Sequence, residues 1–226
     1  MGLDFTVVLR NLDYLLWGRL TDGELGGLLL TVVMAVSAGI LSLALGIALA
    51  MVAWRCQASR KLLFLWAELI RGIPLIFVIF WLYFLVPALF GGGIPNALSV
   101  ILALAWFSSA AIMHSVLAGL QSLPRSQYEA GIASGLAEHQ VLCWILLPQA
   151  LRNLIPSFVG LFASLIKDTS LAFIVNVPEL TTVASQVNNR TQLFPTEIFL
   201  SIAAMYFVLC GVLSLAARAV CGPSSR

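Results

Sequence analysis

Residues 27–54 read GLLLTVVMAVSAGILSLALGIALAMVAW, a run without a single charged side chain. A helix needs about 20 mostly apolar residues to cross the hydrocarbon core of a bilayer. This stretch is longer than that, so it predicts a membrane-spanning helix. We therefore expect a membrane protein, and further spans in the rest of the chain.

Four more apolar runs follow the first one. They cover about residues 73–90, 98–120, 154–175 and 198–220. The composition agrees, because 61% of the 226 residues are hydrophobic and only 10% are charged, against about 25% charged residues in a typical soluble domain. We therefore predict an all-α, polytopic membrane protein with five transmembrane helices, forming a single domain over residues 1–226.

The charged residues are few, and their distribution indicates an orientation. The formal net charge is only +2 and no basic stripe is present, so nothing points to a nucleic-acid partner. Lys and Arg gather in cytoplasmic loops, and one set of connections carries most of them: Arg55, Arg60, Lys61, Arg71, Arg125, Arg152, Arg218 and Arg226. With five spans, this set predicts an N-terminus outside the cell membrane and a cytoplasmic C-terminus.

The connection at about residues 121–153 is polar, although it lies between two apolar runs. It contains PRSQYEAGIASGLAEHQ at residues 124–140. Ser126 and Glu129 have the spacing of a capping box, in which each side chain satisfies a free backbone N–H at a helix start. Gly135 should end this short helix and let the chain turn into a second one, which Pro148 breaks or kinks.

The first of these short helices should have a narrow apolar face, because Tyr128, Ile132 and Leu136 recur at every fourth position. One interpretation is a connector that lies on the membrane, with Glu129 doing no more than capping the helix. The alternative is a docking element. It is favoured because the connection is long for a simple turn and has little charge to hold it at lipid headgroups, so a protein partner suits its apolar face.

Three stretches of the chain resemble a known family. Residues 129–150, EAGIASGLAEHQVLCWILLPQA, resemble the cytoplasmic EAA loop of the membrane subunits of ATP-binding-cassette (ABC) importers. Residues 71–87, RGIPLIFVIFWLYFLVP, and 165–180, LIKDTSLAFIVNVPEL, look like the polar amino acid permeases, the histidine, glutamine, arginine and glutamate/aspartate group. The resemblance covers about residues 26–219 and implies the type I ABC importer transmembrane fold.

The resemblance also implies a role for the loop. It would form two short coupling helices that dock in a groove of a cytoplasmic ATPase and convey the closure of two ATPases to the spanning helices. Glu129 would meet a basic group of the ATPase, and Gly135 would permit the bend. Gly131 stands where a second alanine is usual. The residues expected to take part in coupling are Tyr128, Glu129, Ala130, Gly131, Gly135, Leu136 and Pro148.

The partners implied by the resemblance are a cytoplasmic ABC ATPase dimer that binds ATP and Mg²⁺, a second permease subunit, identical or homologous, and a periplasmic or tethered solute-binding protein, all at the bacterial inner membrane. The chain has no GxxxxGK[ST] sequence for nucleotide binding and no nucleophile–base set. We therefore expect a transport subunit rather than an enzyme, without a cofactor or metal of its own. The rival interpretation is an ion-coupled secondary transporter or a channel, which would predict internal repeats and more intramembrane charge.

Lys167, Asp168, Thr169 and Ser170 interrupt the fourth apolar run. Charges within a membrane usually face a bundle interior or an aqueous cavity. The simpler interpretation puts Lys167 and Asp168 at the membrane edge, paired with each other or with water. The functional one is a transport pathway, in which Asp168 takes a substrate ammonium, and Lys167 or the two hydroxyls take its carboxylate.

Glu68 and Arg71 lie one helical turn apart, just before Pro74. A local ion pair is the simpler interpretation, and a place in the transport pathway is the alternative. Lys167 and Arg71 are the candidate basic groups for an acidic substrate. The FWLYFLVP and KDTSL segments weakly favour the glutamate/aspartate branch of the family.

Overall fold

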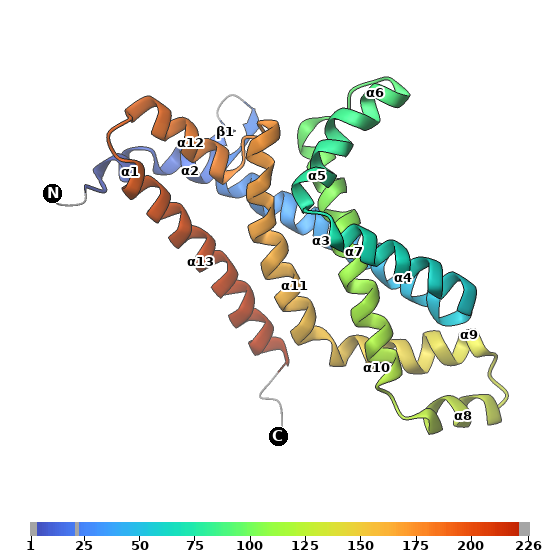
Figure 1. Ribbon diagram of the computed structural model, residues 1–226. Coiled ribbons are helices and arrows are strands. Elements are labelled where there is room, and N and C mark those ends of the chain that lie inside the picture. The colour runs from blue at the N-terminus through green and yellow to red at the C-terminus, as the bar shows by residue number, and fades with distance from the viewer. Residues whose placement is uncertain (1–3, 21–22, 222–226) are drawn as a thin grey trace.

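The computed structural model describes residues 4–20 and 23–221, nearly all of them helical (Figure 1). Two short helices, α1 (Thr6–Arg10) and α2 (Leu12–Trp17), come first. They lead into an antiparallel pair of two-residue strands, β1 (Gly18–Arg19) and β2 (Glu24–Leu25), which the sequence did not predict. This pair of strands directly precedes the first long helix, which begins at Gly27.

Among the described residues, four helices are long and apolar enough to cross a membrane. They are α3 (Gly27–Arg55), α7 (Asn96–Gln121), α11 (Ile155–Asp168) together with the 3₁₀ segment η4 (Thr169–Val175), and α13 (Pro195–Cys221). Each lies within a few residues of a predicted apolar run. The prediction of an all-α membrane fold is therefore confirmed.

The second apolar run differs from the prediction. It is divided into α5 (Leu75–Phe80), the π-helical segment η2 (Trp81–Leu85) and α6 (Val86–Phe90), and helix α4 (Gln57–Gly72) precedes it at an angle of 100°. The expected basic connection at 55–61 is thus mostly helix. If the bent pair counts as one span, the number of spans is the predicted five.

Proline explains the bend between α4 and α5. Pro74 has no N–H to donate, and its ring disfavours a helical conformation at the residue before it. Ile73 is accordingly extended, with φ −99° and ψ 134°. The two π-helical segments also lie just before prolines: η2 precedes Pro87, and η3 (Val141–Leu146) precedes Pro148.

The centre of the fold is the contact between α3 and α7. Gly46 of α3 lies so close to α7 that a Cβ atom there would be 2.6 Å from Ile112 Cγ2 and 2.9 Å from the Ser109 carbonyl oxygen. Small residues allow spanning helices to approach in this way. Helix α11 packs on α3 at Gly39, where a Cβ would meet the Phe162 ring at 2.8 Å.

The short helices gather at two ends of the molecule (Figure 1). At one end lie α8 (Arg125–Ala133), α9 (Glu138–Gln140), η3 and α10 (Leu147–Asn153). At the opposite end α12 (Leu180–Thr191) packs beside α1 and α2. Helix α12 thus lies within the connection between η4 and α13.

Candidate functional site

The polar connection forms a helical hairpin, as predicted, and Gly135 makes its turn. Helix α8 ends at Ala133, and Gly135 follows with φ +85°, a conformation that suits glycine. The Leu136 N–H donates to the Gly131 carbonyl (3.2 Å) and the Gly135 N–H to the Ile132 carbonyl (2.9 Å). These two bonds are those of a Schellman motif, which closes a helix C-terminus.

The predicted capping box is wrong. Helix α8 begins at Arg125, two residues earlier than expected, because Pro124 has a φ that suits a helix entrance and needs no N–H partner. Ser126 therefore lies inside the first turn, and no side chain caps the helix. Glu129 instead pairs with Arg125 along the helix, with 3.0 Å between Oε1 and Nε, and its side chain remains 62% exposed. An exposed i,i+4 pair contributes only about 0.3–0.5 kcal/mol.

The apolar face of α8 is mostly used within the chain. Tyr128 and Leu136 pack against buried residues of η3 and the ends of α3 and α7, whereas Ile132 is exposed. Gly131 lies under Val141, and a Cβ there would be 2.8 Å from Val141 Cγ2. The exposed surface of α8 therefore includes Glu129, Ala130 and Ile132, but not the whole predicted apolar face.

The second arm of the hairpin is anchored in the body of the protein. Val141, Leu142, Leu146 and Ala150 are buried in the same core as the ends of α3 and α7. Trp144, in contrast, is 65% exposed, which the sequence did not predict. The second arm of the hairpin is thus packed directly against the spanning helices α3 and α7.

A cavity of about 460 Å³ separates the hairpin from the ends of α3 and α7. Its walls include Arg55, Arg125, Tyr128, Glu138 and His139. Burial, followed by the nearby Glu138 carboxylate, raises the pKa of the Tyr128 phenol above its ordinary value of 10.0. Tyr128 is therefore a neutral group at physiological pH, and it packs between the two arms of the hairpin.

The second candidate cluster lies where α11 becomes η4. Lys167 is exposed, Asp168 and Ser170 are half-buried, and neither charged side chain forms an ion pair within residues 4–20 and 23–221. Thr169 is fully buried, and its hydroxyl donates to the Ile166 carbonyl at 2.7 Å. Lys167, Asp168 and Ser170 are the members of this cluster that remain accessible.

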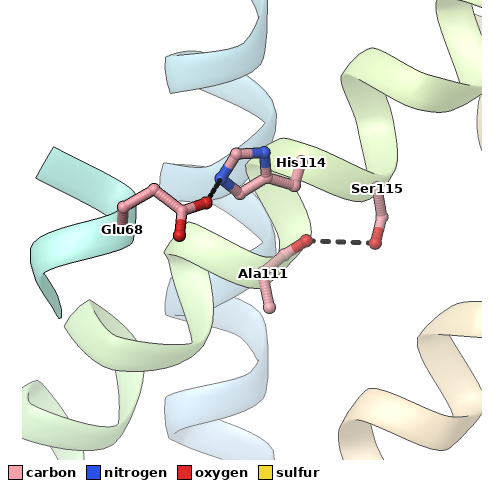
Figure 2. A network of polar contacts seen from close by, with 4 residues as sticks. All are labelled: Glu68, Ala111, His114 and Ser115. Carbon is pink, nitrogen blue, oxygen red and sulfur yellow. Dashed lines mark hydrogen bonds and ion pairs between the residues drawn. The ribbon is translucent and has the colours of Figure 1, made fainter. Parts of the chain in front are cut away.

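The third candidate cluster does not form the predicted local pair. Glu68 of α4 points toward His114 of α7, with 3.8 Å between Oε1 and Nε2 (Figure 2), and it forms no ion pair with Arg71 among the described residues. This distance is too long for a hydrogen bond, and the two groups form an ion pair only when the imidazole is protonated. The His114 ring also stacks edge-on against Phe64, with 4.7 Å between ring centroids. In the same turn of α7, the Ser115 hydroxyl donates to the Ala111 carbonyl (3.0 Å).

These two clusters lie on different elements of the fold. Helix α4 packs chiefly on α3 and α7, whereas α11 packs on α3, α7 and α13. Within residues 4–20 and 23–221, no ion pair joins Glu68 or Arg71 to Lys167 or Asp168. The six candidate pathway residues therefore form two groups, one on α4 and one where α11 becomes η4.

A buried glutamate at the other end of the molecule was missed by sequence reasoning. Glu179 is 0% exposed and caps α12, accepting hydrogen bonds from the backbone N–H groups of Thr181 and Thr182 (both 2.9 Å). It also accepts from the Tyr206 hydroxyl of α13 (3.1 Å) and the Thr182 hydroxyl (3.2 Å). Burial raises the pKa of Glu179, and these hydrogen bonds oppose that rise.

Two more bonds tie the same segment to α3. The Leu180 N–H donates to the Thr31 hydroxyl (3.1 Å), and the Gly27 N–H donates to the Pro178 carbonyl (2.9 Å). The segment before α12 therefore joins α3, α12 and α13 at one point. The available signal was weak, because glutamate is not a preferred N-cap residue.

The chain was also compared with known protein families and proteins. Residues 42–221 match the family described as "Binding-protein-dependent transport system inner membrane component". The "Probable glutamine ABC transporter permease protein GlnP" of Bacillus subtilis (strain 168) is 41% identical over 67% of this chain and 70% of its own length. The "L-cystine transport system permease protein TcyB" of the same organism is 33% identical over 78% of this chain and 77% of its own length.

Solved structures show the same fold. A chain from the crystal structure of an amino acid ABC transporter with histidines superposes with a TM-score of 0.82, at 24% identity, over 97% of this chain and 98% of its own. A chain of the inward-facing MetNI methionine ABC transporter gives a TM-score of 0.68, at 18% identity, over 84% of this chain and 93% of its own. These two similarities concern the fold alone.

Proposed function

The chain belongs to the family of binding-protein-dependent transport system inner membrane components, and on this premise we propose that it is the permease subunit of an ATP-driven importer of a polar amino acid. As a transport component it supplies a path through the membrane. The observation that carries the proposal is the hairpin α8–α10, which is exposed on one side and anchored in the spanning core on the other. A hairpin with one exposed and one anchored side can transmit movement from a separate ATPase subunit to the spanning helices.

The motor is a cytoplasmic ABC ATPase dimer, which holds the ATP and Mg²⁺. Glu129 and Ile132 are the exposed acidic and apolar groups of α8 that contact it. Gly135 and the packing of Gly131 on Val141 keep the two arms at a fixed angle. Pro148 and the widened segment η3 lie where the hairpin continues toward α11, so closure of the ATPases is transmitted to the spanning helices there.

The pathway requires a second permease subunit, identical or homologous, because this chain brings its candidate polar residues to separate places. Asp168, half-buried at the end of α11, is the group that receives a substrate ammonium. Lys167 and Ser170 are placed beside it for a carboxylate. Glu68 and Arg71 belong to a separate polar contact with α7 and line the pathway from another side.

A periplasmic or tethered solute-binding protein delivers the substrate at the α12 end, and the hairpin end is cytoplasmic. This orientation rests on the basic residues, which are concentrated near the hairpin end in Arg55, Arg60, Lys61, Arg125 and Arg152. The N-terminus is then outside the membrane and the C-terminus is in the cytoplasm.

The substrate class is polar amino acids. The names of similar permeases mention glutamine, cystine, arginine, and glutamate and aspartate. The glutamine permease shares 41% identity over part of the chain, and a glutamate/aspartate permease of Escherichia coli shares 29% over 91% of it. Glutamate or aspartate remains the sequence-based prediction, with glutamine as the first competitor to test.

The proposal is tested by uptake into proteoliposomes that contain the permease with its ATPase and solute-binding protein. We expect uptake of a labelled polar amino acid only when all components and ATP are present. A matched reaction replaces ATP by a non-hydrolysable analogue and should show none. The rival, an ion-coupled transporter, predicts the opposite: uptake by the purified chain alone down an ion gradient, without any ATPase.

A further inference from the structure

A second hollow lies at the hairpin end of the molecule, on the other side of Trp54 from the cavity described above. Its volume is about 580 Å³, and it is lined by Ala53, Trp54, Gln57, Arg60, Lys61 and Phe64, from the end of α3 and the first turns of α4. None of the residues proposed to act in coupling or in the pathway lines it. The hollow is therefore a separate feature of the surface.

The polar groups of this hollow suit an anion. Two cations, Arg60 and Lys61, line it together with the Gln57 amide, and no acidic side chain is among the lining residues. Neither cation forms an ion pair with any residue in 4–20 or 23–221. The Arg60 guanidinium lies over the Phe64 ring, with 5.4 Å from Cζ to the ring centroid. This stacking holds the guanidinium in the hollow while leaving its N–H donors free.

The position of the hollow suits a lipid rather than a soluble anion. The spanning helix α3 ends at Arg55, so the hollow lies where the apolar sequence gives way to basic residues. Trp54 is an aromatic residue of the kind found at membrane–water interfaces. Next to the Lys61 side of α4, Leu62, Leu65 and Leu69 are exposed in succession along the helix. They form an apolar strip that begins at the hollow and continues toward the middle of the fold.

We propose that this hollow is a binding site for the phosphodiester headgroup of an anionic phospholipid. Arg60 and Lys61 neutralise the phosphate, the Gln57 amide and Trp54 indole N–H donate hydrogen bonds to its oxygens or to the glycerol hydroxyls, and the acyl chains lie along the exposed leucines of α4. Basic pockets between spanning helices bind anionic headgroups by this combination of charge and apolar contact. The site is independent of the transported substrate.

The direct test is native mass spectrometry of the assembled transporter after exchange into nanodiscs of equal phosphatidylglycerol and phosphatidylcholine. We expect the wild-type complex to retain phosphatidylglycerol in preference to phosphatidylcholine. R60Q/K61Q should reduce that retention by roughly tenfold or more, because each basic group near the surface contributes appreciably to anionic lipid binding. The conservative R60K/K61R variant, which keeps both charges, should retain the lipid and shows that the positions tolerate substitution.

The matched control is R152Q/R218Q, which removes two exposed basic residues that do not line the hollow. It should leave lipid retention at the wild-type level. Equal retention of the two lipids by the wild type, or equal losses in R60Q/K61Q and R152Q/R218Q, would overturn the proposal. Displacement of the lipid by millimolar glycerol 3-phosphate or inorganic phosphate would also overturn it, because the site would then bind soluble anions.

Discussion

Two short helices outside the spanning bundle, α8 and α12, lie at opposite ends of the molecule (Figure 1), and each has a glutamate in or just before its first turns. Glu179 at α12 is fully buried and accepts four hydrogen bonds. Glu129 on α8 is 62% exposed and contacts only Arg125 of its own helix. The same residue type thus has two different environments in two polar connections of the chain.

The difference separates a structural acid from one that is free to bind a partner. A buried carboxylate is stable only where donors replace its water, and Glu179 uses those donors to join α12 to α13. The exposed pair of Glu129 adds little to the stability of α8. Its carboxylate has further acceptor sites that remain exposed. Substitutions at the two positions should therefore change different properties.

The largest expected effect is that of Glu179→Ala. The N–H groups of Thr181 and Thr182 and the Tyr206 hydroxyl would lose their acceptor. Each unsatisfied donor costs about 1–3 kcal/mol, so we expect a loss of about 3 kcal/mol in the free energy of unfolding. Thermal unfolding of the purified protein in detergent measures it.

Glu24→Ala is the matched control, because Glu24 is an exposed acid near the same end of the molecule, on β2. It should leave the unfolding temperature within error of the wild type. If Glu179→Ala were equally harmless, the buried network would not hold α12 in place, and the contrast between the two glutamates would disappear.

The second effect concerns transport rather than stability. Glu129→Lys places a cation where a basic group of the ATPase is expected, and we expect uptake to fall about tenfold or more, equivalent to about 1.4 kcal/mol or more of lost coupling. The unfolding temperature should hardly change, because only an exposed ion pair is lost. ATP-driven uptake in proteoliposomes and thermal unfolding are measured on the same preparation.

The double substitution R125E/E129K distinguishes the two possible roles of Glu129. It restores an ion pair along α8 with the charges exchanged. If Glu129 acts only within the helix, this variant should transport normally. A docking contact predicts that uptake stays low, since the charge presented to the ATPase is still reversed.

Asp168 provides an acid of intermediate burial, between the two extremes. Asp168→Asn keeps its shape and removes the charge proposed to receive a substrate ammonium. We expect uptake to fall roughly fivefold, which corresponds to about 1 kcal/mol. Assembly of the transporter should not change. Concentration-dependent uptake should show a higher half-saturating concentration; unaltered kinetics would place Asp168 at the membrane edge and outside the pathway.

The smallest effect concerns the packing between the arms of the hairpin. Gly131→Ala puts a methyl group against Val141, whose β-branched side chain has little freedom to move, and should cost about 1 kcal/mol of stability. The cost should shrink in a Val141→Ala background, which a double-mutant cycle measures. Gly160→Ala, where a new Cβ would meet nothing within 4 Å, should not destabilise the protein.

The sequence was most informative where one simple rule dominates. Apolar length located the spans, and Gly135 located the turn of the hairpin, because few residues other than glycine adopt its φ of +85°. Pro74 accounts for the bend after α4, but the helix α4 itself, which packs against α3 and α7, was not predicted. The spacing of residues along the sequence does not predict packing between distant helices.

Polar partners were less predictable for the same reason. Ser126 and Glu129 have a capping-box spacing, but a start at Arg125 after Pro124 places both inside the helix. Glu68 was paired with Arg71 by spacing, yet its carboxylate faces His114, which is far away in sequence. Glu179 depends on Tyr206 and on the burial of a whole segment. Contacts of this kind between distant segments leave no periodic signal.

In the proposed transporter the exposed glutamate of α8 contacts an ATPase, whereas the α12 end does not. This contact can be tested by disulfide cross-linking of a single cysteine, at position 129 or 24, in a chain whose four native cysteines are replaced by serine. We predict that E129C forms a cross-link with a cysteine in the docking groove of the ATPase and that E24C forms none. Cross-linking of neither variant, or of E24C as readily as E129C, would contradict the account.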